Sequence, residues 1–94
     1  MQQESSSSAY SSGLRVIVRA YGGNPCIRKV LSTTDTAVFV CREGSYEAIL
    51  AGERDSPMVG FPFEDVFQFD ETAAAIITAG NRLDWNRLRP IRSA

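Results

Sequence analysis

The side chains of this chain that could do chemistry are two cysteines, Cys26 and Cys41, and several acids that include the neighbours Glu64 and Asp65. Two thiols are too few to complete a zinc site, and the sequence has no histidine to supply further ligands. Without histidine the chain also lacks the commonest general base at neutral pH. Adjacent strand residues point to opposite faces, so Glu64 and Asp65 would not act on one substrate atom. We therefore predict no catalytic, metal or cofactor site, and expect the protein not to be an enzyme.

The two cysteines flank a predicted hairpin. Segments 26–31 and 37–41 are apolar and β-branched and enclose a polar turn, a pattern typical of antiparallel strands. Pairing Leu31 with Thr36 would place Val30 opposite Ala37 and Cys26 opposite Cys41. The start of the chain lacks the basic and apolar regions of a secretory signal, so we expect a cytoplasmic protein with reduced thiols that pack as small apolar groups. A redox role is the alternative, but there is no C-x-x-C motif.

The length allows one small domain, because 94 residues support a single core. Residues 1–12 are serine-rich with little to bury, and we expect them to form a disordered arm before a domain over residues 13–94. The stretch LRVIVRAY alternates between apolar and polar positions and predicts a half-buried strand from residue 14.

Two short helices are predicted from their end signals. The first begins at Ser45 and ends at Gly52, and the second begins at Asp70 and ends at Gly80. At helical spacing their apolar faces are Tyr46, Ile49 and Leu50 in the first and Ala73, Ile76 and Ile77 in the second. The remainder of the C-terminal helix and tail (71–94) spaces apolar residues between arginines, which suits either a turn or an extended segment.

Four of the five phenylalanines lie in the stretch FPFEDVFQF, residues 61–69. Each ring would bury about 150–200 Å² on folding, worth several kcal/mol at about 25 cal/mol per Å². We therefore predict that Phe61, Phe67 and Phe69 belong to the core, with Phe67 and Phe69 on one face of a strand beginning at Val66. The alternative is an aromatic recognition surface.

The same stretch carries a resemblance. Gly60, Pro62 and Val66 resemble the late G-x-x-P-x-x-x-V signature of Src-homology-three domains, in which a glycine- and proline-containing stretch leads through a tight turn into the last strand of a small barrel. In this chain the glycine is one residue closer to the proline, and Asp65 stands where the family has a tyrosine of its proline-peptide groove. The resemblance covers residues 14–70 and implies the barrel rather than that ligand. The predicted fold class is mainly β with short helices: a small antiparallel Src-homology-three-like barrel or curled sheet, plus a C-terminal helix.

Charge is segregated along the chain. Residues 1–42 contain five basic and two acidic side chains, residues 43–79 one and eight, and residues 80–94 four and one, which gives segment charges of +3, −7 and +3. Either the basic ends fold back on the acidic middle or the segments solvate different faces, or a basic tail binds an anionic partner. The pI of about 5.3 disfavours nucleic acid as that partner.

We expect a non-catalytic protein-interaction module that binds an unknown protein or a second copy of itself, because small barrels present edges and loops to partners. The candidate contact residues are Tyr21, Tyr46, Trp85, Arg87 and Arg89. The alternative is a nucleic-acid-binding barrel, in which Tyr21 and Trp85 share a basic groove with Arg15, Arg19, Arg28, Lys29, Arg82, Arg87, Arg89 and Arg92. A membrane is not an expected partner, because the longest apolar run, residues 73–77, is too short to span one.

Overall fold

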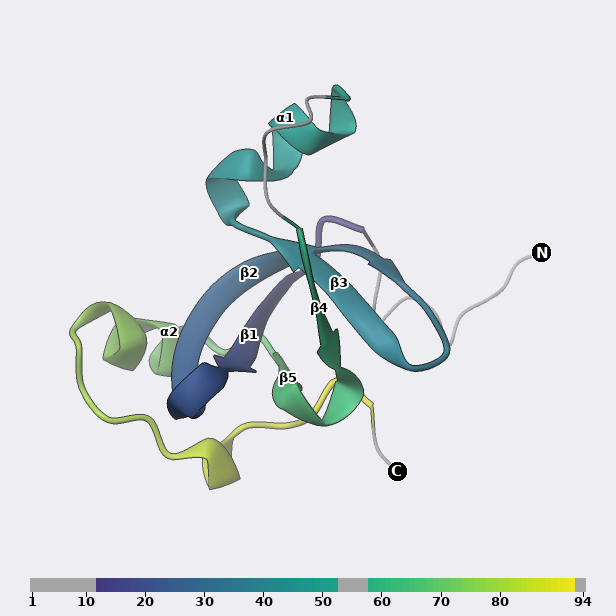
Figure 1. The fold of residues 1–94 in the computed structure, drawn as a ribbon. Coiled ribbons are helices and arrows are strands. Elements are labelled where there is room, and N and C mark those ends of the chain that lie inside the picture. Colours follow the sequence, from purple (N-terminus) through teal and green to yellow (C-terminus); the bar gives the residue numbers. More distant parts are fainter. Residues whose placement is uncertain (1–11, 53–57, 93–94) are drawn as a thin grey trace.

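The computed structural model describes residues 12–52 and 58–92. In these residues five antiparallel strands form one sheet in the order β4-β3-β2-β1-β5, and Figure 1 shows the sheet curling into a half-barrel. The strands are β1 (Arg15–Ala20), β2 (Asn24–Thr33), β3 (Ala37–Cys41), β4 (Val59–Pro62) and β5 (Val66–Gln68). The predicted class, mainly β with short helices, is confirmed.

Short helices fill the connections between the strands. The α-helices are α1 (Tyr46–Leu50) and α2 (Glu71–Thr78), and the 3-10 turns are Tyr21–Gly23, Glu43–Ser45, Phe63–Asp65 and Trp85–Arg87. In Figure 1, α1 stands at one end of the sheet, and the C-terminal segment with its last 3-10 turn runs past the opposite end. Within the described residues, no helix is long and apolar enough to cross a membrane.

Strand β1 is buried on both faces. Val16, Ile17 and Val18 are each 0% exposed. Val16 and Val18 belong to an inner cluster within the curl of the sheet, whereas Ile17 packs on the other face with Phe67 and with Ala73 of α2. The prediction of a half-buried strand is therefore wrong, because α2 and the C-terminal segment cover the face that would otherwise meet water.

The phenylalanines divide between these two clusters. Phe61 and Phe63 are half-buried and pack against the inner cluster, while Phe67 and Phe69 belong to the outer one. Phe67 is 6% exposed, and its neighbour Val66 faces the inner cluster, as strand alternation predicts. The prediction of core material is confirmed for Phe67, whereas Phe61 and Phe69 are half-buried against the two clusters.

The hairpin of β2 and β3 is confirmed, but its predicted register is wrong. Val30 pairs with Val40 rather than with Ala37, and beyond Val30 the register shifts so that Ser32 pairs with Phe39. An irregularity of this kind inserts a residue into one strand, and a register extrapolated from the turn does not anticipate it.

The cysteines lie in different strand pairings as a result. Cys41 is opposite Lys29 of β2, and Cys26 is opposite Val18 of β1. The prediction that the thiols face each other across the hairpin is wrong, and both are free. Cys41 is 2% exposed and Cys26 packs against the inner cluster, so both act as small apolar side chains.

The predicted helix signals are confirmed at α2 and fail in part at α1. An Asp70 carboxylate oxygen accepts a hydrogen bond from the Ala73 N–H at 2.8 Å, and Gly80 ends the helix with a φ of +78°. Ser45 precedes α1 but makes no side-chain capping bond. Leu50 is 58% exposed, so it does not dock on the sheet as predicted.

The C-terminal segment covers the free edge of β5. After the Trp85–Arg87 turn the chain becomes extended: the Gln68 N–H donates to the Arg89 carbonyl at 2.7 Å, and the Ile91 N–H to the Val66 carbonyl at 3.1 Å. The two conformations left open by the sequence, turn and extended, therefore occur in succession. Most of the predicted disordered arm, residues 1–12, lies outside the described residues, which begin at Ser12.

Candidate interaction surface

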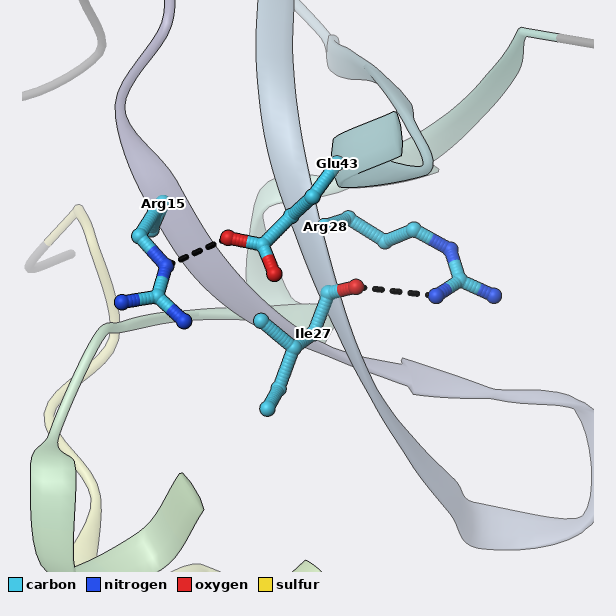
Figure 2. Close-up of polar contacts among 4 residues, drawn as sticks. All are labelled: Arg15, Ile27, Arg28 and Glu43. Atoms are coloured by element: carbon cyan, nitrogen blue, oxygen red, sulfur yellow. Dashed lines mark hydrogen bonds and ion pairs between the residues drawn. The ribbon is translucent and has the colours of Figure 1, made fainter. Parts of the chain in front are cut away.

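The cations predicted to converge are separated by contacts within the chain. Arg15 forms an ion pair with Glu43, and its guanidinium lies 4.1 Å from the ring centroid of Phe69. Figure 2 shows the Arg28 guanidinium directed away from that pair, where it donates to the Ile27 carbonyl at 2.8 Å. Arg15 and Arg28 therefore do not form one basic groove.

Tyr46 is held by contacts of its own at the α1 end of the molecule. Its hydroxyl lies 2.8 Å from the Ser12 hydroxyl, and the Lys29 ammonium lies 4.9 Å from its ring centroid. This end is opposite to the segment that carries Trp85 (Figure 1). Tyr46 is therefore not brought together with the other predicted contact residues.

Arg19 links the sheet to the C-terminal segment. It forms an ion pair with Asp65 at 3.1 Å, and its guanidinium lies 5.1 Å from the Phe67 ring centroid and 5.3 Å from that of Trp85. The Phe67 and Trp85 rings themselves pack at 5.1 Å with a tilt of 38°. The basic first part of the chain thus folds onto its acidic middle, as one of the charge interpretations predicts for both ends.

Trp85 lies between two open hollows and lines both. The smaller, about 430 Å³, contains Arg19, Phe67 and Pro90. The larger, about 830 Å³, lies between the β1–β2 turn and the loop that follows α2. The indole is half-buried because it packs on Phe67 while its remaining surface borders these hollows.

Tyr21 stands beside the larger hollow with its side chain in solvent. It is 98% exposed and opens the 3-10 turn whose next residues, Gly22 and Gly23, line that hollow. Both glycines have positive φ values, +78° and +79°, which turn the chain tightly and leave the tyrosine ring outside the fold. The fold makes no use of this ring.

The arginines around Trp85 are more exposed than those of the sheet. Arg87 reaches Asp84 only at 3.8 Å, with 86% of its side chain exposed. Arg82 and Arg89 are exposed, and neither has a side-chain partner within residues 12–52 and 58–92. Arg82 lines the larger hollow, whereas Arg89 does not.

We define the Trp85 surface as Tyr21, Arg82, Trp85 and the larger hollow between them. Of the five predicted contact residues, Trp85 lines this hollow and Tyr21 directly precedes its lining residue Gly22. Arg87 and Arg89 lie on the same C-terminal segment but line other hollows. The sequence groups Arg82 only with the cations of the nucleic-acid alternative, because nothing local in it shows that the loop after Gly80 folds towards the β1–β2 turn.

The buried thiol of Cys41 is not prepared for nucleophilic chemistry. Burial raises its pKa above the ordinary thiol value, and the positive charges of Lys29 and Arg28 oppose that shift. In the described part of the chain, no group of three or more histidine, cysteine or acidic side chains could hold a metal ion.

No family model, curated protein or solved structure matches this chain.

Proposed function

We propose that this chain is a non-catalytic protein-interaction module that binds its partner through the Trp85 surface. The observation that carries the proposal is the 98% exposure of Tyr21, which directly precedes Gly22 in the wall of a hollow that Trp85 lines. Tyrosine, tryptophan and arginine are enriched among the residues that dominate binding energy at protein interfaces. The exposed Tyr21 ring contributes no packing to the fold, so we assign it to binding.

The non-catalytic part of the proposal is supported by the positions of the acids. Asp65 is engaged by Arg19, and the carbonyl of Glu64 also accepts a hydrogen bond from Arg19 at 3.1 Å. An acid held by an arginine in this way stabilises the link between β1 and the turn after β4. It is not poised as a general base.

We further propose that the half-barrel is Src-homology-three-like. Gly60 and Pro62 lie in β4, a 3-10 turn follows at Phe63–Asp65, and Val66 begins β5. This order of glycine and proline, tight turn and last strand is the one the sequence resemblance implies. Because Asp65 is bound to Arg19, the proposal does not extend to a proline-peptide groove.

Nucleic acid is the second candidate. The exposed arginines of segment 82–89 lie on the segment that carries Trp85, and stacking rings with nearby cations suit single-stranded nucleic acid. Against it, Arg15, Arg19 and Lys29 are engaged with acids or rings of the chain itself. A protein partner is therefore the proposal, and nucleic acid is an outcome of its test.

The test uses Tyr21→Ala, with Leu50→Ala as the matched control. Both replaced side chains are large and exposed, 98% and 58%, but Leu50 belongs to α1 at the opposite end of the molecule. The tagged full chain and both variants would be used to capture proteins from an extract of the native cells, with thermal melting as the check on folding. We expect Tyr21→Ala to melt like the unmodified chain and to lose its specific partner, and Leu50→Ala to retain it.

Equal capture by folded Tyr21→Ala would contradict the proposal. A mobility shift of a short single-stranded oligonucleotide at low salt, lost in Tyr21→Ala, would replace it with the nucleic-acid function.

A further inference from the structure

The larger hollow of the Trp85 surface has a mixed polar and apolar lining that carries one charge. Its apolar lining comes from Ile77 of α2, Leu83, Trp85 and Pro25, and its charged lining residue is Arg82. Among the described residues no acid lines it. Arg82 also lines a neighbouring hollow together with Asp70 and Asp84, but within the described residues it forms no ion pair with either aspartate. In the larger hollow Arg82 is the charged lining residue, and no acid of the described residues opposes it there.

The backbone that carries Arg82 is fixed in place. The Gly80 N–H donates to the Ile77 carbonyl and the Asn81 N–H to the Ile76 carbonyl, both at 3.0 Å. With the positive φ of Gly80, these two bonds form the Schellman arrangement that ends a helix. Arg82 thus leaves a rigid turn, so binding a ligand requires ordering of its side chain but not of its backbone.

The opposite wall of the hollow is formed by the β1–β2 turn. Gly22 and Gly23 form part of it, and a side chain built on Gly23 would meet no atom within 4 Å. The two glycines leave part of this wall without side chains, next to Asn24 and Pro25, and an extended peptide can approach the backbone closely there. A volume of about 830 Å³ has room for more than one side chain of such a peptide.

We infer that this hollow binds an acidic segment of the partner protein, with a carboxylate on Arg82 and an adjacent apolar side chain against Trp85, Ile77 and Leu83. The inference rests on the proposed function and specifies the chemistry of the partner. Arg82 has no partner of its own within the described residues, and a guanidinium pairs with a carboxylate through two parallel hydrogen bonds. The surrounding residues 80–92, with four arginines and one aspartate, carry a charge of +3 that attracts the same ligand.

Trp85 provides the readout, because it is the single tryptophan of the chain and borders the hollow. The full chain would be titrated with acetyl-Leu-Phe-Glu-Leu-amide and with the same peptide carrying Gln in place of Glu. We expect a saturable change in indole fluorescence with the Glu peptide, and about tenfold weaker binding of the Gln peptide, as for loss of a charged hydrogen-bonded partner. The preference should shrink as salt is added.

Two variants test whether the preference for the Glu peptide over the Gln peptide depends on Arg82. Arg82→Gln should bind both peptides alike, while Arg89→Gln should keep the preference for Glu. These substitutions remove the same charge from the same segment, but Arg89 does not line the hollow. Equal losses in the two variants would mean general electrostatic attraction and would overturn the inference. Equal binding of the two peptides to the unmodified chain, or no response to either, would overturn it as well, and so would Arg82-dependent binding of oligothymidylate in place of the peptides.

Failure of this inference is distinguishable from failure of the proposed function. If partner capture depends on Tyr21 while the chain binds the Glu and Gln peptides equally, the proposed function is supported and the inference of an acidic partner segment is wrong. If capture is independent of Tyr21, the proposed function fails whichever peptide binds.

Discussion

The guanidinium of Arg19 lies 5.3 Å from the ring centroid of Trp85, and this contact joins β1 to the C-terminal segment. The same guanidinium forms the ion pair with Asp65 in the turn between β4 and β5. One side chain therefore positions both the surface proposed to bind a partner and the turn that leads into the last strand.

Arg19→Lys tests whether this contact depends on the planar guanidinium. A lysine keeps the charge but loses the second hydrogen bond and most of the stacking, so we expect the free energy of unfolding to fall by about 1 kcal/mol. Arg19→Ala should cost somewhat more and make the Trp85 emission shift to the red, because the indole gains water. Denaturant titration followed by fluorescence and by circular dichroism measures both effects. An unchanged emission maximum in Arg19→Ala would contradict the stacking role.

Ile91→Ala tests whether the C-terminal segment is part of the barrel core. Ile91 is 5% exposed, belongs to the inner cluster and donates its N–H to the Val66 carbonyl. We expect the truncation to lower the free energy of unfolding by about 2–4 kcal/mol, as for other buried large-to-small substitutions, and Ile91→Val by about 1 kcal/mol. A loss below about 0.5 kcal/mol in Ile91→Ala would mean that the segment is peripheral. If Ile91→Ala does not fold, Ile91→Val provides the second measurement.

Local signals in the sequence predict the element types well because they act over a few residues. The Asp70 cap and the Gly80 stop bracket α2, and the alternation from Val66 assigns Phe67 to one face of β5. Each of these features depends on neighbours in sequence, so the periodic pattern is sufficient to find it.

The features that the sequence did not reveal depend on distant segments. Ile17 is buried because α2 and the C-terminal segment pack over β1. The sequence of the strand itself does not predict this packing. The register of the hairpin changes at an irregularity after Val30. The Trp85 surface likewise depends on the β1–β2 turn and the loop after α2 lining one hollow, and these two segments are far apart in the sequence. Fold class was therefore predictable, whereas register and the composition of the site were not.

Gly60→Ala tests a close contact across β3 and β4. Gly60 pairs with Phe39, and a Cβ atom at position 60 would lie 3.0 Å from Cε2 of that ring. We expect Gly60→Ala to destabilise the protein by about 1 kcal/mol or more, because the ring must move aside. In the double variant with Phe39→Leu, the cost of the alanine should largely disappear, giving a coupling energy measurable by denaturant titration. Additive effects of the two substitutions would show that the ring and the glycine do not constrain each other.

Cys41 should make stability fall at alkaline pH. Burial raises the pKa of its thiol in the folded protein, with the charges of Lys29 and Arg28 opposing that rise. The unfolded chain, whose thiol has a pKa of about 8.5, therefore loses its proton first as the pH rises, and ionisation then favours unfolding. The stabilising contribution is full below about pH 8 and declines between the unfolded and folded pKa values.

The measurement is the free energy of unfolding from about pH 7 to about pH 10, compared between the unmodified chain and Cys41→Val. Valine fills the buried position without a titrating group. The free energy of unfolding of Cys41→Val minus that of the unmodified chain should therefore be constant near pH 7 and should increase above about pH 8.5. Cys26→Val serves as the control and should keep the alkaline decline, because it leaves Cys41 in place. A constant difference between the unmodified chain and Cys41→Val across the whole range would show that burial does not suppress ionisation of this thiol.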